Sequence, residues 1–194
     1  MPRVTGLRER RGGRVAVEVD GSPWRTLPVD AAARAELRVG AELDRARLRT
    51  LRRELRRSEA LSWAVRALRR RDFSARGLEE RLERVGLREE ERRSALGTLE
   101  RAGLLDDERF AAGRAGALAE RGYGNDAIRW ILEREGVAAE LTAEAVGALP
   151  PERERAVQVA ARRGGGPATA AYLARRGFAV DSIETALGET AAEG

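Results

Sequence analysis

A recurring pattern of helix starts and ends constrains the fold of this sequence more than any other feature. In its two clearest copies, an aromatic residue precedes the expected helix, aliphatic residues follow at helical spacing, and the helix ends at a glycine followed by an apolar residue. The aromatic residue can pack on the first helical turn, and the glycine can adopt the left-handed conformation that ends a helix. Pairs of matching residues are 50 positions apart: Phe73/Tyr123, Leu78/Ile128, Leu82/Leu132, Gly86/Gly136 and Leu87/Val137.

A weaker third copy ends at Gly177 and Phe178, with Thr169 where the second copy has Ile128. The apolar stripes are narrow, so one copy alone buries little surface, whereas stacked copies share a continuous core. We therefore predict a mainly α protein, elongated and helix-turn-helix-like, built from tandem three-helix repeats. The expected parts are an N-terminal part over 1–57, repeats over 58–105, 106–150 and 151–188, and a loose tail over 189–194.

The N-terminal part shows strand periodicity. Valines alternate at positions 15, 17 and 19, and Asp20-Gly21 is a typical turn sequence. We expect a hairpin or a three-stranded sheet over about 3–29, packed on helices through Trp24. These helices are expected to begin at the N-caps Asp30, Asp44 and Ser58, and the first of them to extend to Arg38.

The composition excludes several kinds of enzyme. The 194 residues contain no Cys, no His and no Lys, so all 37 basic residues are arginine. Thiol nucleophiles, His-containing triads, Cys or His metal sites, Schiff-base lysines and P-loops are therefore excluded. Carboxylate chemistry remains, such as Mg²⁺ binding or glycoside hydrolysis, and six Ser and two Tyr remain for nucleophile roles. We expect a protein that is not an enzyme and has no catalytic residues, metal or cofactor.

No apolar run is long enough to span a membrane, and no apolar segment of a secretory signal opens the chain, so we expect a cytoplasmic protein. The net charge is +5, and it is unevenly spread. Residues 45–101 hold 18 arginines and 10 acidic residues, whereas residues 102–149 hold 5 arginines and 9 acidic residues. This asymmetry predicts a part of the chain that faces a polyanion.

Two groups of arginines in the basic stretch are candidate partner-binding or DNA-binding residues. The first four share one side of a helix, and all seven could contact DNA phosphates or an acidic protein surface. The alternative is a solvated helix face with ion pairs to Glu54 and Glu59, and complementation of a helix dipole at 69–71. Trp63 and Trp130 are expected to pack in the core or between repeats rather than to stack on bases. The candidates are Arg52, Arg53, Arg56, Arg57, Arg69, Arg70 and Arg71.

The most distinctive local string is Gly103-Leu-Leu-Asp-Asp-Glu-Arg-Phe-Ala111. Asp106 is a good N-cap, and Asp107 with Glu108 suits the positive end of the new helix. Leu105 and Phe110 stand at the two positions of a hydrophobic staple. We interpret the string as a helix start rather than as a metal site, because further ligands are not evident.

This string resembles part of the RecX family of bacterial recombinase regulators. The resemblance continues through Arg121-Gly122-Tyr123-Gly124 and a helix that ends at Gly136-Val137. Residues 71–86 resemble the first repeat of that family, and the strand pair resembles its N-terminal extension. One departure is Gly77, which stands where the family often has the Glu of a capping box after Ser74, so a weaker helix start is expected. The motif residues, interpreted as mainly structural, are Asp106, Asp107, Arg109, Phe110, Gly122, Gly124 and Gly136.

The resemblance implies a regulator that binds the filament of RecA recombinase on single-stranded DNA. Such proteins limit filament growth and damp strand exchange, ATP hydrolysis and co-protease activity. We expect a monomer whose partners are RecA and single-stranded DNA, with double-stranded DNA as a further candidate. Two alternatives stay open: a helix-turn-helix DNA-binding protein that acts without RecA, and a Mg²⁺ nuclease that uses Asp106 and Asp107.

Overall fold

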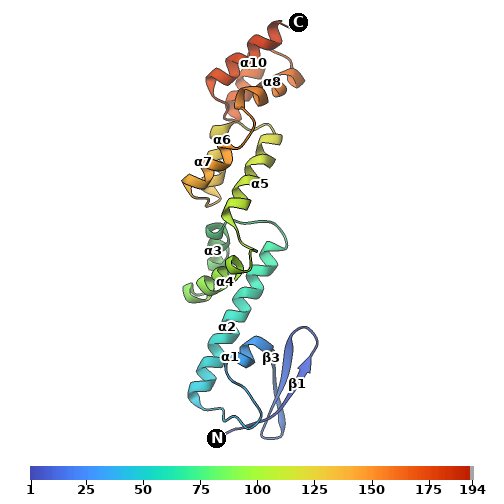
Figure 1. Ribbon diagram of the computed structural model, residues 1–194, viewed down its shortest axis with the longest axis vertical. Helices are drawn as coiled ribbons and strands as arrows, with labels where there is room; N and C mark the ends of the chain where they lie inside the picture. Colours follow the sequence, from blue (N-terminus) through green and yellow to red (C-terminus); the bar gives the residue numbers. More distant parts are fainter. Residues whose placement is uncertain (193–194) are drawn as a thin grey trace. The chain divides into compact units, whose positions relative to one another are not determined.

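The computed structural model describes residues 1–192, with side chains up to residue 189 (Figure 1). The chain divides into two compact units: residues 1–71 together with 79–102, and residues 72–78 together with 103–194. Helix α3 (Ala75–Arg84) contributes residues to both units. The described residues form three strands and ten helices, which confirms the prediction of a mainly α chain with a small N-terminal sheet. None of these helices combines the length and the hydropathy of a membrane span.

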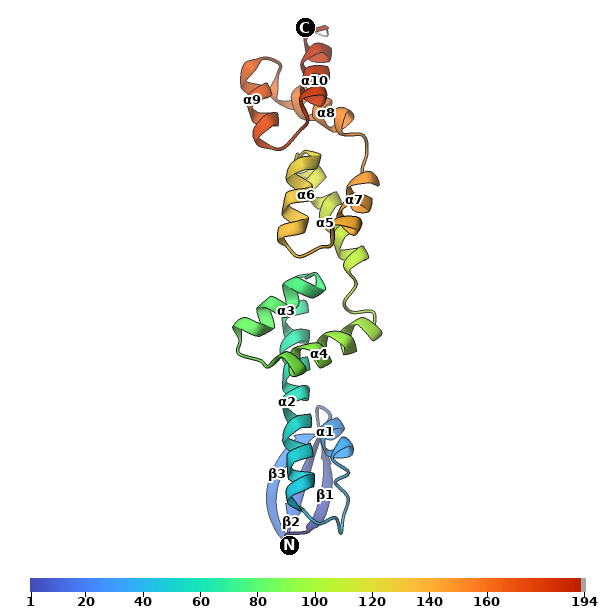
Figure 2. The same cartoon turned by 90° about the vertical axis from the view of Figure 1, so that its left-hand side faces the viewer.

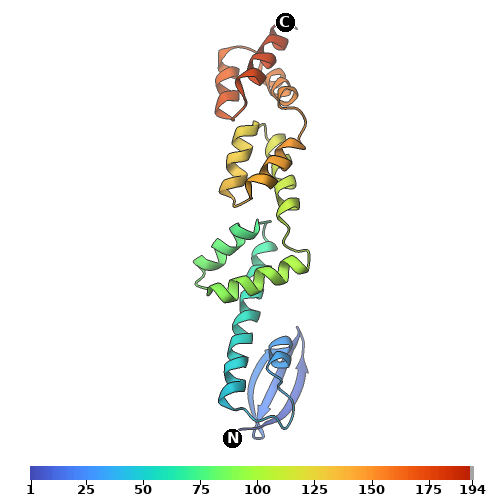
Figure 3. The same cartoon turned by 60° about the vertical axis from the view of Figure 1, so that its left-hand side comes forward.

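The first unit begins with an antiparallel sheet of β1 (Val4–Arg10), β2 (Arg14–Val19) and β3 (Ser22–Pro28) in the order β1-β2-β3. Asp20 and Gly21 both have positive φ, as a tight turn between β2 and β3 requires. One face of the sheet packs on α1 (Val29–Arg34) and on the first half of α2 (Arg45–Leu68), as Figure 3 shows. The core between them is apolar and includes Val4, Val15, Val17, Leu27, Ala32 and Leu51.

Two of the three predicted N-caps in this unit are wrong. Helix α1 begins at Val29, after Pro28, so Asp30 lies in its first turn, where a carboxylate suits the helix dipole, and the helix ends short of Arg38. Asp44 is confirmed, because its side chain accepts the backbone N–H of Arg47 at 2.7 Å. Ser58 does not begin a helix, and the boundary expected at 57/58 falls inside α2.

Helix α2 continues past Ser58 because nothing in its sequence stops it and a buried stripe runs on along it. The stripe in the second half consists of small residues, with Ala60 and Ala64 fully buried. Helix α4 (Glu89–Arg101) packs on α2 and has its own buried residues, Ala95 and Leu99. Small side chains on α2 allow the two helix axes to approach closely.

Residues 103–192 of the second unit form two groups of three helices, which can be followed in Figure 2. The first group is α5 (Asp107–Glu120), α6 (Asn125–Arg134) and α7 (Ala139–Gly147), with Ile128 and Leu132 in its core. The second group is α8 (Glu152–Arg163), α9 (Pro167–Arg175) and α10 (Val180–Ala192), with Leu173 and Phe178 in its core. The tail expected from residue 189 is wrong up to Ala192, because α10 continues to that residue; positions 193–194 lie outside the described residues.

The predicted glycine helix ends are confirmed. Gly86, Gly103, Gly122, Gly136 and Gly177 all have φ between +65° and +90°. The apolar residue that follows often bonds back over the last turn; for example, the N–H of Val137 donates to the carbonyl of Leu132 at 3.0 Å. These bonds satisfy carbonyls that a helix end otherwise leaves unpaired.

One kind of contact between successive groups of helices occurs twice within the second unit. In each case the start of the second helix of one group contacts the end of the second helix of the next group, and we call this contact a junction. Ser74, just before α3, donates its hydroxyl to the carbonyl of Glu135 at the end of α6. Gly124, just before α6, donates its N–H to the carbonyl of Arg176 at the end of α9, at 2.9 Å. Each junction brings a positive helix end to a negative one.

Helix α3 is capped at its start by Ser74, although the Glu of a capping box is absent. Ser74 Oγ accepts the N–H of Gly77 at 3.0 Å, so one free donor of the helix start is satisfied without a capping-box Glu. A Cβ on Gly77 would lie 3.0 Å from the carbonyl oxygen of Glu135. Glycine is therefore suited to this position, because the next helix end approaches it closely.

Candidate nucleic-acid interface

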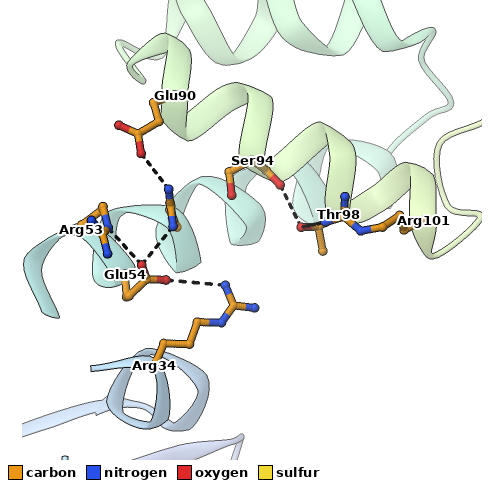
Figure 4. Close-up of polar contacts among 8 residues, drawn as sticks. Arg34, Arg53, Glu54, Glu90, Ser94, Thr98 and Arg101 are labelled. Carbon is orange, nitrogen blue, oxygen red and sulfur yellow. Dashed lines mark hydrogen bonds and ion pairs between the residues drawn. The ribbon is translucent and has the colours of Figure 1, made fainter. Parts of the chain in front are cut away.

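Two arginines of the predicted cluster on α2, Arg53 and Arg57, contact one buried carboxylate. Glu54 is only 4% exposed. Its oxygens lie 3.0 Å from Arg57, 3.2 Å from Arg53 and 3.6 Å from Arg34, which comes from α1 (Figure 4). Three guanidinium groups thus compensate one charge that would otherwise be costly to bury.

Acidic residues of α4 also form ion pairs with arginines of this cluster. Arg57 also contacts Glu90 at 2.7 Å, and Arg56 contacts Glu91 at 3.1 Å. These ion pairs join α2 to α4, so Arg53, Arg56 and Arg57 have structural partners. Arg52 differs from the other three, because it has no ion pair among the described residues; it is exposed, as Arg53 and Arg56 also are.

A shallow groove includes residues of this cluster and residues nearer the start of α2. It is lined by Arg49, Arg52, Arg53 and Arg56, with Glu90 at its side. Arg49 is also exposed and has no ion pair within the described part of the chain. Sequence reasoning missed Arg49, although its spacing of three from Arg52 places both on one helix face. We call Arg49 and Arg52 the free arginine pair.

The second predicted group lies at the end of α2. Arg69 is the C-cap residue, and its N–H donates to the carbonyl of Val65 at 3.0 Å. Arg69, Arg70 and Arg71 are all exposed. Their positive charges lie at the negative end of a long helix, which is a favourable place for them. The exposed position also leaves them accessible to a polyanion.

The packing predicted for two tryptophans is wrong. Trp63 is 40% exposed and Trp130 is 58% exposed. The buried residues in the second half of α2 are alanines, and the large ring of Trp63 stays at the edge of this stripe. In both cases an arginine covers the ring: Arg66 lies 4.6 Å from the Trp63 centroid, and Arg134 lies 5.0 Å from the Trp130 centroid. These are cation–π contacts.

Trp63 belongs to a surface with a composition suited to nucleic acid. A small depression beside it combines an aromatic ring, apolar side chains and three arginines, and no acidic residue lines it. An exposed aromatic ring can stack on a base while arginines contact phosphates. Sequence analysis missed Arg66 and Arg81, although the spacing of three between Trp63 and Arg66 indicated a shared face. We call this the Trp63 surface; it consists of Trp63, Arg66, Ala67, Arg70, Arg81, Leu82 and Val85.

The two aspartates of the motif cap two different helices. Asp106 is the N-cap of α5, as predicted, and accepts the N–H of Arg109 at 2.9 Å. Asp107 accepts the N–H of Ala75, the first residue of α3, at 2.7 Å. Arg109 also donates to the carbonyl of Gly103 at 3.2 Å. Within the described residues, no group of three or more acidic side chains gathers in a way that could hold a metal ion.

The remaining motif residues lie in tightly packed places. Phe110 is half-buried against the core of α5 to α7. Gly124 is buried, and a Cβ there would lie 2.2 Å from the carbonyl oxygen of Gly177. Gly136 faces Arg76, whose Cβ would lie 2.9 Å from an added Cβ. Gly122 supplies the positive φ that ends α5.

Comparisons with known proteins place the fold. No family model and no curated protein sequence matches the chain. A crystal structure of the regulatory protein RecX superposes with a TM-score of 0.82, covering 96% of this chain and 98% of that one at 19% identity. RecX from Lactobacillus salivarius superposes with a TM-score of 0.62, covering 71% of this chain and 97% of that one at 17% identity. The chain therefore has the fold of these RecX structures.

Proposed function

We propose that this protein is a RecX-type regulator that binds the filament of RecA on single-stranded DNA and negatively modulates it. The modulated activities are strand exchange, ATP hydrolysis and co-protease activity. The observation that carries the proposal is the likeness of the fold to the regulatory protein RecX over 96% of the chain. The motif from Gly103 to Gly124 supports it, because the sequence resembles that family there and the motif builds the junctions between repeats.

Two surfaces of the first unit support contact with the filament. The Trp63 surface offers one ring for base stacking and arginines for phosphates. The free arginine pair on α2 offers two guanidinium groups with no carboxylate partner among the described residues. Arginine suits both phosphate and carboxylate partners because its planar fork donates two parallel hydrogen bonds.

We infer that the protein acts through contact rather than catalysis, as a monomer in the cytoplasm. The absence of Cys, His and Lys from the sequence supports this inference, because it excludes most nucleophiles and bases. A helix-turn-helix protein that binds DNA without RecA remains the alternative, and the experiment below separates the two.

The test measures DNA-dependent ATP hydrolysis by RecA from the same organism, with the protein present below the concentration of RecA. We expect the wild-type protein to slow hydrolysis. Reversing both charges of the free arginine pair, with Arg49→Glu and Arg52→Glu, should weaken inhibition at least fivefold and lower its salt dependence. The matched control is Arg10→Glu with Arg11→Glu, which makes the same charge change at two exposed positions, the last residue of β1 and the first residue of the turn after it.

Three outcomes are informative. If the α2 variant loses inhibition of ATP hydrolysis and the control keeps it, the result supports the proposal and shows that the free arginine pair contributes to binding of the filament. Unchanged ATP hydrolysis with wild-type protein overturns the proposal. A specific shift of one duplex sequence, together with no effect on RecA, would establish the helix-turn-helix alternative.

A further inference from the structure

The second unit contains a pocket of about 530 Å³ where the end of α5 meets α8 and α9. Its size is typical of small-molecule pockets, which span roughly 300–1,000 Å³. Leu149 and Val159 provide apolar wall, and Gln158 provides a neutral polar group. The pocket is otherwise rich in arginine and contains one tyrosine: Arg121, Arg155, Arg162, Arg163 and Tyr172.

Arg155 adds a buried positive charge to the lining of this pocket. It is only 7% exposed and donates to the carbonyl of Pro150 at 3.1 Å, to the carbonyl of Tyr123 at 2.7 Å and to Oδ1 of Asn125. All three acceptors are neutral. Burial lowers the pKa of Arg155, an effect that the nearby Glu152 carboxylate opposes, and an arginine remains charged at neutral pH.

The other three arginines are exposed. Arg121 and Arg162 have no ion pair among the described residues. The guanidinium carbon of Arg163 lies over the Tyr172 ring, 3.8 Å from its centroid, in a cation–π contact. Such a stacked guanidinium offers a planar face to a base as well as hydrogen-bond donors to a phosphate.

A count of the charges decides what the pocket attracts. Arg121 and Arg163 lie at the ends of α5 and α8, and each helix end carries a partial charge of about −0.5. Glu120 is the one acidic residue among the described residues that line the pocket. Its carboxylate and the two helix ends together carry a charge of about −2, whereas the four arginines carry +4. The Glu152 carboxylate accepts the N–H groups of Asn125 and Ala179, at the starts of α6 and α10, where the positive helix ends offset it. An excess of about two positive charges remains, which matches a phosphate dianion.

We propose that this pocket binds a phosphate ester, with Arg121 and Arg162 on the phosphate and the Arg163–Tyr172 stack against a base. The ligand is a free nucleotide or one nucleotide of a nucleic-acid strand. Residues of the second unit form this pocket, whereas the Trp63 surface and the free arginine pair belong to the first unit. The ligand of the pocket goes beyond the proposed function and does not depend on it.

The test is equilibrium dialysis of the full chain against labelled ADP, without any recombinase present. Pyrophosphate, adenosine and a short oligo(dT) serve as competitors. We expect ADP to bind, pyrophosphate to compete and adenosine to fail, because the charge excess selects phosphate. Arg121→Gln and Arg162→Gln should each weaken binding about tenfold, equal to about 1.4 kcal/mol. The control is Arg153→Gln, on the same helix as Arg162 but outside the pocket.

The competitors also identify the source of the phosphate. If oligo(dT) displaces ADP, and if the same variants lose both ADP binding and oligo(dT) binding, the pocket binds a nucleic-acid strand. Retention of ADP in the presence of oligo(dT) assigns it to a free nucleotide. The proposal is overturned if neither ADP, pyrophosphate nor oligo(dT) binds at millimolar concentration, or if Arg121→Gln and Arg162→Gln bind like Arg153→Gln. Circular dichroism of each variant establishes that the helices are intact.

Discussion

Asp107 accepts a hydrogen bond at 2.7 Å from the backbone N–H of Ala75, a residue 32 positions earlier in the chain. Asp107 is the first residue of α5, and Ala75 is the first residue of α3. The next group of helices repeats this relationship, because Glu152, the first residue of α8, accepts the N–H of Asn125, the first residue of α6. The leading helix of one repeat thus caps the second helix of the repeat before it.

Removing this cap at Asp107 should destabilise the second unit. We expect Asp107→Ala to lower the free energy of unfolding by about 1–2 kcal/mol, because an N–H at a helix start loses its acceptor. Glu108→Ala is the control, since Glu108 lies in the same helical turn and is exposed. Urea denaturation followed by circular dichroism measures both. Equal midpoints for the two variants would contradict the capping role.

Glu152 should contribute more than Asp107, because its carboxylate has more partners. It accepts the N–H of Asn125, the N–H of Ala179 at 3.2 Å and the hydroxyl of Ser182 at 3.2 Å. We expect Glu152→Ala to cost about 2–3 kcal/mol of unfolding free energy, against less than about 0.5 kcal/mol for exposed Glu154→Ala. Hydrogen exchange should rise at the starts of both α6 and α10. Faster exchange at only one of them would show that the carboxylate does not bridge the two helices.

Two glycine substitutions should change stability in opposite directions. A Cβ at Gly124 would meet the backbone of Gly177 at 2.2 Å, so Gly124→Ala should destabilise by about 2 kcal/mol or more. Gly113 lies inside α5 with nothing within 4 Å of an added Cβ, so Gly113→Ala should stabilise by about 0.5–1 kcal/mol. Thermal unfolding measures both shifts. A Gly124→Ala protein as stable as wild type would refute the close approach.

Neutralising Glu54 should lower stability while raising affinity for polyanions. Its arginine partners are partly exposed and can be rehydrated, so Glu54→Gln should cost about 1–2 kcal/mol rather than the larger penalty of a fully buried pair. The released Arg53 and Arg57 should strengthen binding to oligo(dT) about two- to fivefold at low salt. Glu59→Gln makes the same charge change at an exposed site of α2 and should do less. Equal affinities for the two variants would show that Glu54 does not restrain the cluster.

Trp63 should contribute to single-strand binding through stacking. Trp63→Ala should weaken oligo(dT) binding about tenfold, within the roughly 1–3 kcal/mol expected per stacked base, and Trp63→Phe should restore part of the loss. Fluorescence anisotropy of a labelled oligo(dT) measures this. Trp130→Ala is the control, because Trp130 is a similar exposed ring outside the Trp63 surface. The stacking role fails if the alanine and phenylalanine variants at position 63 bind alike.

Local features of the fold could be predicted from the sequence because each depends on residues within one helical turn. The caps at Asp44 and Asp106 and the glycine helix ends at Gly86, Gly136 and Gly177 are all of this kind. The valine alternation in β2 is equally local. Predictions failed where a local pattern had to compete with packing. Ser58 is a reasonable N-cap by itself, but α2 continues through it because its buried stripe goes on to α4.

The sequence by itself determined the repeat, the helix ends and the excess of arginine in one stretch of the chain. Only the tertiary structure decided which arginines are engaged. Arg53, Arg56 and Arg57 form ion pairs with acidic residues of α2 and α4, whereas Arg49 and Arg52 form none among the described residues. The physical reason is that an ion pair depends on which helices pack together. That packing also brought Arg121, 34 positions before Arg155, to the same pocket, a proximity that no local spacing contains.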